Sequence, residues 1–285
     1  MEKKFIRRLQ WLLTGPLLII GLATENPANS KEPDPITKIL KKESCEYCDL
    51  RYANITNADL SGINLRGAYL FAVQIHNSNL SNANFSGTSL PLAELENCNL
   101  TGINLYKAQF ENASLSHNVL RNANLKFVRA LGVTFSHSDI SGANFEIAEL
   151  SYTNFDSVNA IGTNFQSAWM GGATFKGANL VNAMMDNADL AGADFRNANL
   201  TGADLSRANL RGANLSGANL ENTILREAKL IGANLNGARL IKTDVRNADF
   251  SKADLTSAVL KSVVTEETRV CEAKMPDGTI GSCLK

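Results

Sequence analysis

The chain has 285 residues, a length that allows one large domain or two ordinary ones. Its 28 basic and 28 acidic side chains cancel, which argues against a nucleic-acid-binding protein, because such domains are usually strongly basic. A hydrophobic fraction of 44% excludes a disordered chain, and 5 Cys are too few for a disulfide-dense scaffold.

Residues 1–23 have the pattern of a secretory signal peptide. Lys3, Lys4, Arg7 and Arg8 precede an apolar run that ends in small residues. The alternative is an uncleaved anchor, but the run is shorter than the ~20 residues that span a bilayer. We therefore expect export to the periplasm, the thylakoid lumen or the extracellular space, with a mildly acidic, soluble chain beyond the cleavage site.

Residues 24–44 are expected to form a loose tail and a short capping helix. Asp34 and Pro35 suit the N-cap and the first position of a helix, and apolar residues follow at helical spacing. We predict a helix over 34–43 that covers the first turn of the domain that follows.

A five-residue repeat fills the chain from Leu50 to Leu260. Every fifth residue is large and apolar, with 26 Leu and 9 Phe among 43 positions, and only Ala130 and Ala160 are small. Two residues before each of these positions lies a small residue, which is Ala in 27 cases. A period of five fits neither the helical period of 3.6 nor the strand period of two, so the chain must turn a corner every five residues.

This pattern, Ala-[Asp/Asn]-Leu-x-x, resembles the pentapeptide repeat family. Residues 198–202 are typical and read Ala-Asn-Leu-Thr-Gly, and the match covers about three quarters of the chain. The resemblance implies an all-β fold, namely a right-handed quadrilateral parallel β-helix with four pentapeptides in each coil and about eleven coils. We place this β-helix at 45–262 and a C-terminal cap at 263–285.

Within such a coil, a spacing of 20 residues brings side chains to the same inner position. Phe135, Phe155, Phe175 and Phe195 have this spacing, so we expect their rings to stack on four successive coils. Nearby, Ala130 and Ala160 leave two large inward positions underfilled, and Asn118 places an amide in a small inward position. We expect a local irregularity between those coils, with a bound water.

The cysteines form two pairs near the ends of the repeat. Cys45 and Cys48 have a spacing that fits a redox motif, half of a zinc site or a local disulfide. A zinc site needs four ligands, whereas Cys271 and Cys283 lie about ten coils away. We expect two structural disulfides, the second closing a hairpin around a Pro-Asp-Gly turn, and a buried free thiol at Cys98. The Cys-flanked Met-Pro-Asp-Gly ending is also similar to that of exported members of the family.

The sequence carries no convincing catalytic or metal site, and we expect a protein that is not an enzyme and has no cofactor or metal. His76, His117 and His137 fall on one side of the coil, and the last two should stack about 5 Å apart. No third ligand accompanies them. Glu94 and Glu96 share that side, but an uninterrupted rod offers no concave site for chemistry.

Outward residues sort into four walls, and the wall flanking Leu50, Leu70 and Leu90 is rich in large apolar residues. These are Tyr52, Tyr69, Phe71, Pro91, Leu92, Leu131, Tyr152 and Trp169. Exposed apolar patches usually mark contact surfaces. We predict that a monomeric, non-enzymatic interaction module binds a protein, a polysaccharide or a membrane surface here, and no nucleic acid. The candidate contacts are Tyr69, Phe71, Leu92, Leu131, Tyr152 and Trp169.

Three alternatives accompany this prediction. The resemblance implies one of them, because some cytosolic family members resemble DNA in shape and charge and bind DNA gyrase. The expected export, the mild acidity and the missing loop insertions argue against such a DNA mimic. An ice-binding rod would need ranks of outward Thr, which are scattered here. A structural spacer without a ligand is the third, and the N-terminal helix or tail could also cover the first coils of the wall.

Overall fold

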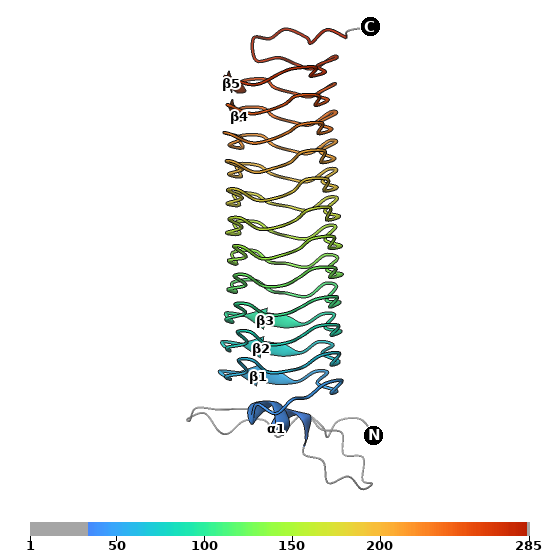
Figure 1. The fold of residues 1–285 in the computed structure, drawn as a ribbon, viewed down its shortest axis with the longest axis vertical. Helices are drawn as coiled ribbons and strands as arrows, with labels where there is room; N and C mark the ends of the chain where they lie inside the picture. Colours follow the sequence, from blue (N-terminus) through green and yellow to red (C-terminus); the bar gives the residue numbers. More distant parts are fainter. Residues whose placement is uncertain (1–33, 284–285) are drawn as a thin grey trace, which may run out of the picture.

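The computed structural model describes residues 34–283, which form one rod with a short helix at its N-terminal end (Figure 1). The predicted signal peptide and tail, residues 1–33, lie outside the described residues. In the rod, residues 20 apart pair in parallel, from Asp49 with Tyr69 to Asp254 with Lys274. Each coil therefore rests on its neighbours, as the five-residue period predicts.

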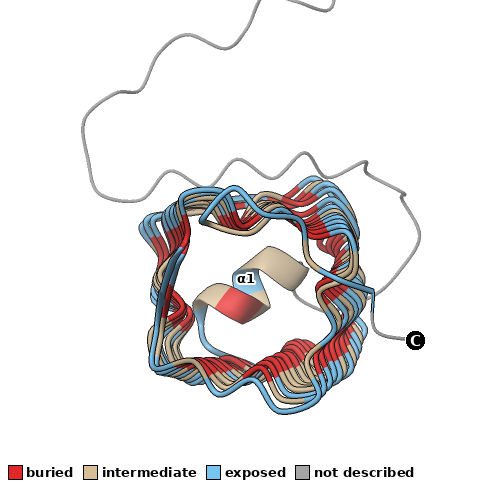
Figure 2. Ribbon diagram, turned by 90° about the horizontal axis from the view of Figure 1, so that it is seen from above, coloured by how far each residue is buried: buried red, intermediate tan, exposed pale blue. Residues whose placement is uncertain are grey.

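Seen along its axis, the rod is four-sided and its coils stack almost directly over one another (Figure 2). The large apolar residue and the small residue two positions earlier are buried at nearly every level. The two residues that follow form a corner, and the second has a left-handed φ, such as 57° at Asn197 and 69° at Gly202. Gly and Asn tolerate this conformation best, which explains why they recur at the position.

At two places the pairing is continuous over three residues and forms short strands. Strands β1 (Asn54–Thr56), β2 (Gln74–His76) and β3 (Glu94–Glu96) make one parallel sheet. Strands β4 (Arg239–Ile241) and β5 (Val259–Lys261) make a parallel pair near the other end. Single bridges join the remaining levels.

Helix α1 (Pro35–Leu40) lies across the bore of the rod and covers its first coil (Figure 2). Asp34 caps it, since one carboxylate oxygen accepts from the Thr37 N–H at 3.4 Å. Ile39 is fully buried against the core. The helix is shorter than the predicted 34–43, because the chain takes a left-handed φ of 58° at Lys42.

The C-terminal end of the rod is less completely covered. Parallel pairing continues to Lys274, which also pairs antiparallel with Ile280 in the terminal hairpin. The coil thus runs beyond the predicted limit of residue 262, where inward positions such as Thr265 lose the apolar signature. Leu260 occupies an inward position but is 42% exposed, because little packs over it.

The predicted Phe stack is confirmed. Its ring centroids are 5.2, 4.8 and 4.8 Å apart, from Phe135 through Phe155 and Phe175 to Phe195. A second stack joins Phe145 to Phe165 at 5.1 Å. The two stacks meet edge to face, with Phe155 6.0 Å from Phe145 and 5.6 Å from Phe165. Such edge-to-face contacts are favourable for aromatic rings, so the two columns fill the bore together.

The irregularity expected at Asn118 is absent. Its Oδ1 accepts from the Cys98 N–H and its Nδ2 donates to the Leu95 carbonyl, both at 2.7 Å. The bridge between Val119 and Asp139 continues without a break. The buried amide is therefore satisfied by backbone groups of the adjacent coil, and a bound water is not needed to satisfy it.

Candidate functional site

We call the side of the rod that contains the outward residues next to Leu50, Leu70 and their equivalents the aromatic face. All six predicted contact residues lie on it, namely Tyr69, Phe71, Leu92, Leu131, Tyr152 and Trp169. Five of them are exposed, most of all Tyr152 at 74% and Trp169 at 61%, while Phe71 is half-buried. The coil register therefore brings residues as far apart in the sequence as Tyr69 and Trp169 onto one surface.

The N-terminal part of the aromatic face holds a cluster of rings. Tyr52 and Phe71 pack edge to face with their centroids 5.4 Å apart. Together with Tyr69, Arg51 and Ser89 they line a shallow groove of about 320 Å³. Tyr52 is 69% exposed, so helix α1, which lies across the end of the bore, does not cover this part of the face.

A second cluster lies halfway along the rod and contains Leu131, Tyr152 and Trp169. The ring of Tyr152 lies along the surface against Gly172, where a Cβ would come within 2.8 Å of the ring carbons. Trp169 pairs through its backbone with Glu149 on one side and Asp189 on the other. The indole is thus flanked by acidic residues on both neighbouring coils.

Charged residues lie along the centre of the face, on the coils of the second cluster and on the coil before it. Arg129 forms ion pairs with Glu149 at 3.2 Å and with Glu111 at 3.9 Å across the middle of the face. The docking region predicted over 92–169 therefore contains ion-paired charges beside its apolar side chains. A ligand covering both clusters would also cover this ion-paired group.

Sequence reasoning missed three apolar residues at the adjoining corner. Tyr106 and Phe127 pack edge to face with centroids 5.7 Å apart, and Ile147 is exposed one coil beyond. Lys107 and Lys126 hold their ammonium groups 5.3 and 5.1 Å from these two rings. Sorting corner residues by coil, and not only by wall, would have found them. They widen the apolar surface around the centre of the rod.

The C-terminal half of the same face is charged. Arg211, Lys229 and Arg269 alternate there with acidic side chains around an open groove of about 510 Å³. The acidic members are Glu227, Asp249 and Glu267. One side of the rod thus changes from aromatic to charged along its length.

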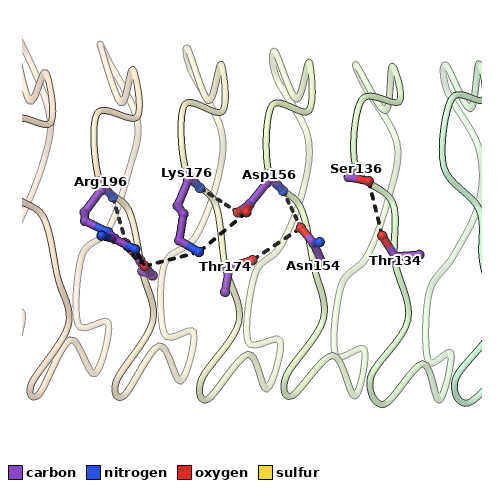
Figure 3. A network of polar contacts seen from close by, with 8 residues as sticks. Thr134, Ser136, Asn154, Asp156, Thr174, Lys176 and Arg196 are labelled. Carbon is purple, nitrogen blue, oxygen red and sulfur yellow. Dashed lines mark hydrogen bonds and ion pairs between the residues drawn. The ribbon is translucent and has the colours of Figure 1, made fainter.

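The wall that carries Asp156, Lys176 and Arg196, here called the polar wall, contrasts with the aromatic face, because its groups satisfy one another (Figure 3). Lys176 Nζ lies 3.7 Å from both Asp156 and Asp194, and Arg196 Nη2 lies 2.8 Å from Asp194. Burial opposes ionisation of Asp194, but hydrogen bonds from Arg196 hold the pKa of its carboxyl below the ordinary value. A surface whose charged groups pair with one another is what we expect of a wall that faces solvent.

The histidines and cysteines that the sequence offered as candidates for chemistry do not form a site. His117 and His137 stack with ring centroids 5.1 Å apart, as predicted, and no acidic or Cys side chain joins them into a metal-binding group within residues 34–283. Cys45–Cys48 and Cys271–Cys283 are disulfides, and Cys98 is free and buried. The bonded sulfurs offer no thiolate ligands.

Among the described residues, no helix has the length and apolar character needed to cross a membrane. No curated protein sequence matches the chain.

The solved structures that are similar to it include the following three. HetL, a pentapeptide repeat protein involved in heterocyst differentiation regulation from the cyanobacterium Nostoc, is 29% identical; the match covers 82% of this chain and 92% of HetL, with a TM-score of 0.32. A pentapeptide repeat protein from the Arabidopsis thaliana thylakoid lumen is 36% identical over 40% of this chain and 68% of its own, with a TM-score of 0.18. QnrB1, a plasmid-mediated fluoroquinolone resistance protein, is 19% identical over 69% of this chain and 91% of its own, with a TM-score of 0.36.

The sequence profile of pentapeptide repeats matches the chain in 8 copies. The matched residues are 48–87, 93–126, 131–166, 161–197, 188–226, 203–240 and 233–263. Proteins of this family fold as right-handed β-helices, and the family is a structural repeat and not a class of enzymes. Since the matches extend over most of the chain and coincide with the coils of the rod, the chain belongs to the pentapeptide repeat family.

Proposed function

We propose that the protein is an exported, non-enzymatic interaction module, built on a quadrilateral β-helix of about eleven coils, whose aromatic face binds a protein partner. The observation that carries this proposal is the exposure of Tyr152 and Trp169 on a rod whose neighbouring wall is polar and self-paired. Aromatic side chains are enriched in interface cores, and large exposed rings on a soluble surface favour contact with another molecule.

Export is supported from both ends of the described rod. The disulfides Cys45–Cys48 and Cys271–Cys283 need an oxidising compartment to form and persist. The basic and apolar pattern of residues 1–23 agrees with such a destination. Periplasm, thylakoid lumen and extracellular space all meet this requirement.

The charges on the rod do not favour the DNA-mimic alternative. A DNA mimic needs rows of acidic groups that imitate phosphates, whereas Arg129 neutralises both Glu111 and Glu149 at the centre of the aromatic face. The groove on its C-terminal half alternates basic and acidic side chains. These surfaces suit a partner with mixed charges and apolar groups.

Affinity capture from the export compartment tests the proposal. Tyr152→Ser combined with Trp169→Ser should lose partners that the wild type retains, because both substitutions remove exposed rings and leave the core intact. The matched control is Ile161→Ser combined with Met184→Ser, which removes exposed apolar side chains from other walls and should retain the partners. Equal recovery by the wild type and the ring-deleted variant, or recovery by neither, would contradict the proposal.

A further inference from the structure

We infer that the occupant of the aromatic face is a second copy of this chain, packed face to face and antiparallel. The inference rests on the proposed function, because it uses the same face and names the partner. Dimer formation would overturn the sequence-based expectation of a monomer.

The two halves of the aromatic face differ in a way that suits such packing. The corner of the N-terminal half carries three large exposed side chains, Tyr52, Leu92 and Tyr152. The corresponding corner of the C-terminal half begins with four glycines, Gly172, Gly192, Gly212 and Gly232, before Lys252 and Glu272. An antiparallel arrangement brings the bulky half of one copy against the glycine half of the other.

The charges specify the register. The two-fold axis runs across the face, perpendicular to the rod, between the levels of Glu149 and Trp169. An outward residue a given number of coils before the axis in one copy then opposes the equivalent residue the same number of coils after the axis in the other copy. Among the residues directly before and after Leu50, Leu70 and their equivalents, three pairs of charged residues oppose each other. They are Arg129 with Asp189, Glu111 with Arg211, and Asp49 with Arg269. All three pairs have opposite signs, and each occurs twice in a symmetric dimer.

The uncharged pairs in this register are compatible as well. Leu131 opposes Ala191, Pro91 opposes Ile231, and Leu92 opposes Gly232. The indole N–H of Trp169 faces the carboxylate of Glu149, which can accept its hydrogen bond. The Tyr152 rings of the two copies meet at the axis, because each ring already leans from its own coil toward Gly172.

Other arrangements are disfavoured by the same charges. A parallel two-fold dimer sets every central residue against itself, so that Arg129, Asp249 and Arg269 would each face a like charge. Moving the antiparallel axis by half a coil in either direction opposes Glu149 to Asp189 or to itself. The favoured register has one unfavourable pair, Lys107 with Arg207, at the corner of the face.

One member of each opposed pair, namely Asp189, Arg211 or Arg269, forms no ion pair within its own chain among residues 34–283, unlike the charges of the polar wall. The other members, Arg129, Glu111 and Asp49, are ion-paired within their own chain. The face spans twelve levels between residues 49 and 269, hence about 53 Å at ~4.8 Å per coil. Five residues per side at ~3.3 Å limit its width to about 16 Å. The product is near the ~800 Å² per partner that stable interfaces bury, so contact along the whole face suffices.

Cross-linking of the full chain tests the orientation. Leu131→Cys and Ala191→Cys in one chain should give a covalent dimer with a bismaleimide whose reach matches the ~10 Å between packed sheets. Within one chain these positions are three coils, or about 14 Å, apart. Each single variant should give little dimer. Dimers from single variants alone would indicate parallel packing and overturn the inference.

Charge exchange tests the register. Sedimentation velocity over a concentration series should show that Arg129→Glu, or Asp189→Arg, weakens dimerisation by about tenfold or more, and that the two together restore it. Lys242→Glu, at a corner away from this face, is the control and should have no effect. A double variant as weak as the single ones would overturn the register.

A wild type that is monomeric at every concentration overturns the self-association as a whole. If affinity capture still distinguishes the wild type from the Tyr152 and Trp169 variant in that case, the proposed function stands with a different partner. If the wild type dimerises and that variant does not, both statements are supported.

Discussion

The ring of Tyr152 lies against Gly172, its equivalent one coil further along the rod, at a distance that leaves no room for a Cβ. Gly192, on the next coil, has nearly the same left-handed φ, 66° against 67°, but no atom lies within 4 Å of the position that a Cβ would take there. Both positions therefore need a left-handed φ, but only Gly172 must also lack a Cβ to make room for the ring of Tyr152.

Replacing each glycine with alanine should reveal this difference. Both Gly172→Ala and Gly192→Ala incur the cost of a left-handed alanine, about 1–2 kcal/mol. Gly172→Ala should cost about 1 kcal/mol more in urea unfolding, because the ring of Tyr152 must also move. Adding Tyr152→Ala should abolish the extra cost; equal losses in the two single variants would show that the ring imposes no constraint.

Phe155 should owe measurable stability to its ring contacts. It stacks between Phe135 and Phe175, and aromatic pairs add ~0.5–1.5 kcal/mol each beyond burial. Phe155→Leu should therefore lower the free energy of unfolding by about 1–3 kcal/mol more than Phe85→Leu. Phe85 is equally buried and has no ring contact among the described residues. Similar losses at both positions would contradict an energetic role for the stack.

Thiol titration should find one free thiol per chain after denaturation without reductant. Both disulfides are closed, and Cys98 is the one free Cys. In the native rod this thiol should react slowly at neutral pH, since burial raises its pKa and only the thiolate is nucleophilic. Three or five free thiols would contradict the pairing and weaken the case for export.

Stability should fall in acid partly through Asp244. Hydrogen bonds from Arg246, opposed by burial and reinforced by Arg226 at 2.6 Å, hold the pKa of this carboxyl well below its ordinary value. Because the folded pKa is the lower one, the stabilisation is present above the unfolded pKa of about 4 and is lost as pH falls through the folded value.

The comparison for this effect is a pair of variants. Asp244→Asn should lower the free energy of unfolding at pH 7 by about 1 kcal/mol or more, and the difference from wild type should shrink below about pH 4. Asp249→Asn is the control, because Asp249 forms no ion pair within residues 34–283. A wild-type advantage over Asp244→Asn that persists unchanged at about pH 2 would disprove the linkage.

Much of the fold follows from the repeat spacing combined with the family resemblance. The resemblance implies four pentapeptides per coil, which places Phe135 and Phe155 one coil apart, and the 5.2 Å between their rings agrees with that placement. The prediction works because nearly every coil contact joins residues separated by 20 positions, so one number fixes the neighbours of each side chain. Both disulfides followed from the pairing of cysteines near the two ends of the repeat.

The other features of the fold and the site depend on side-chain contacts that the five-residue repeat does not determine. Asn118 looked like a defect because its sequence position is small and inward, yet the Cys98 N–H and the Leu95 carbonyl happen to match its amide. The coil continues past the end of the sequence repeat, for example at Thr265, because backbone pairing continues without large inward residues. The sequence assigned residues to the aromatic face but did not reveal the ion pairs of Arg129 along its centre.

The pairing of residues 20 apart also restricts how the length of this protein can change. Inserting a single five-residue unit after Tyr152 would keep every inward position filled and would preserve a stable rod. It would nevertheless turn all later walls by a quarter turn, moving Arg211 and Lys229 away from the side that carries Tyr152. Only insertions or deletions of whole 20-residue coils keep the two halves of the face aligned, so duplication in evolution or design must proceed in that larger unit.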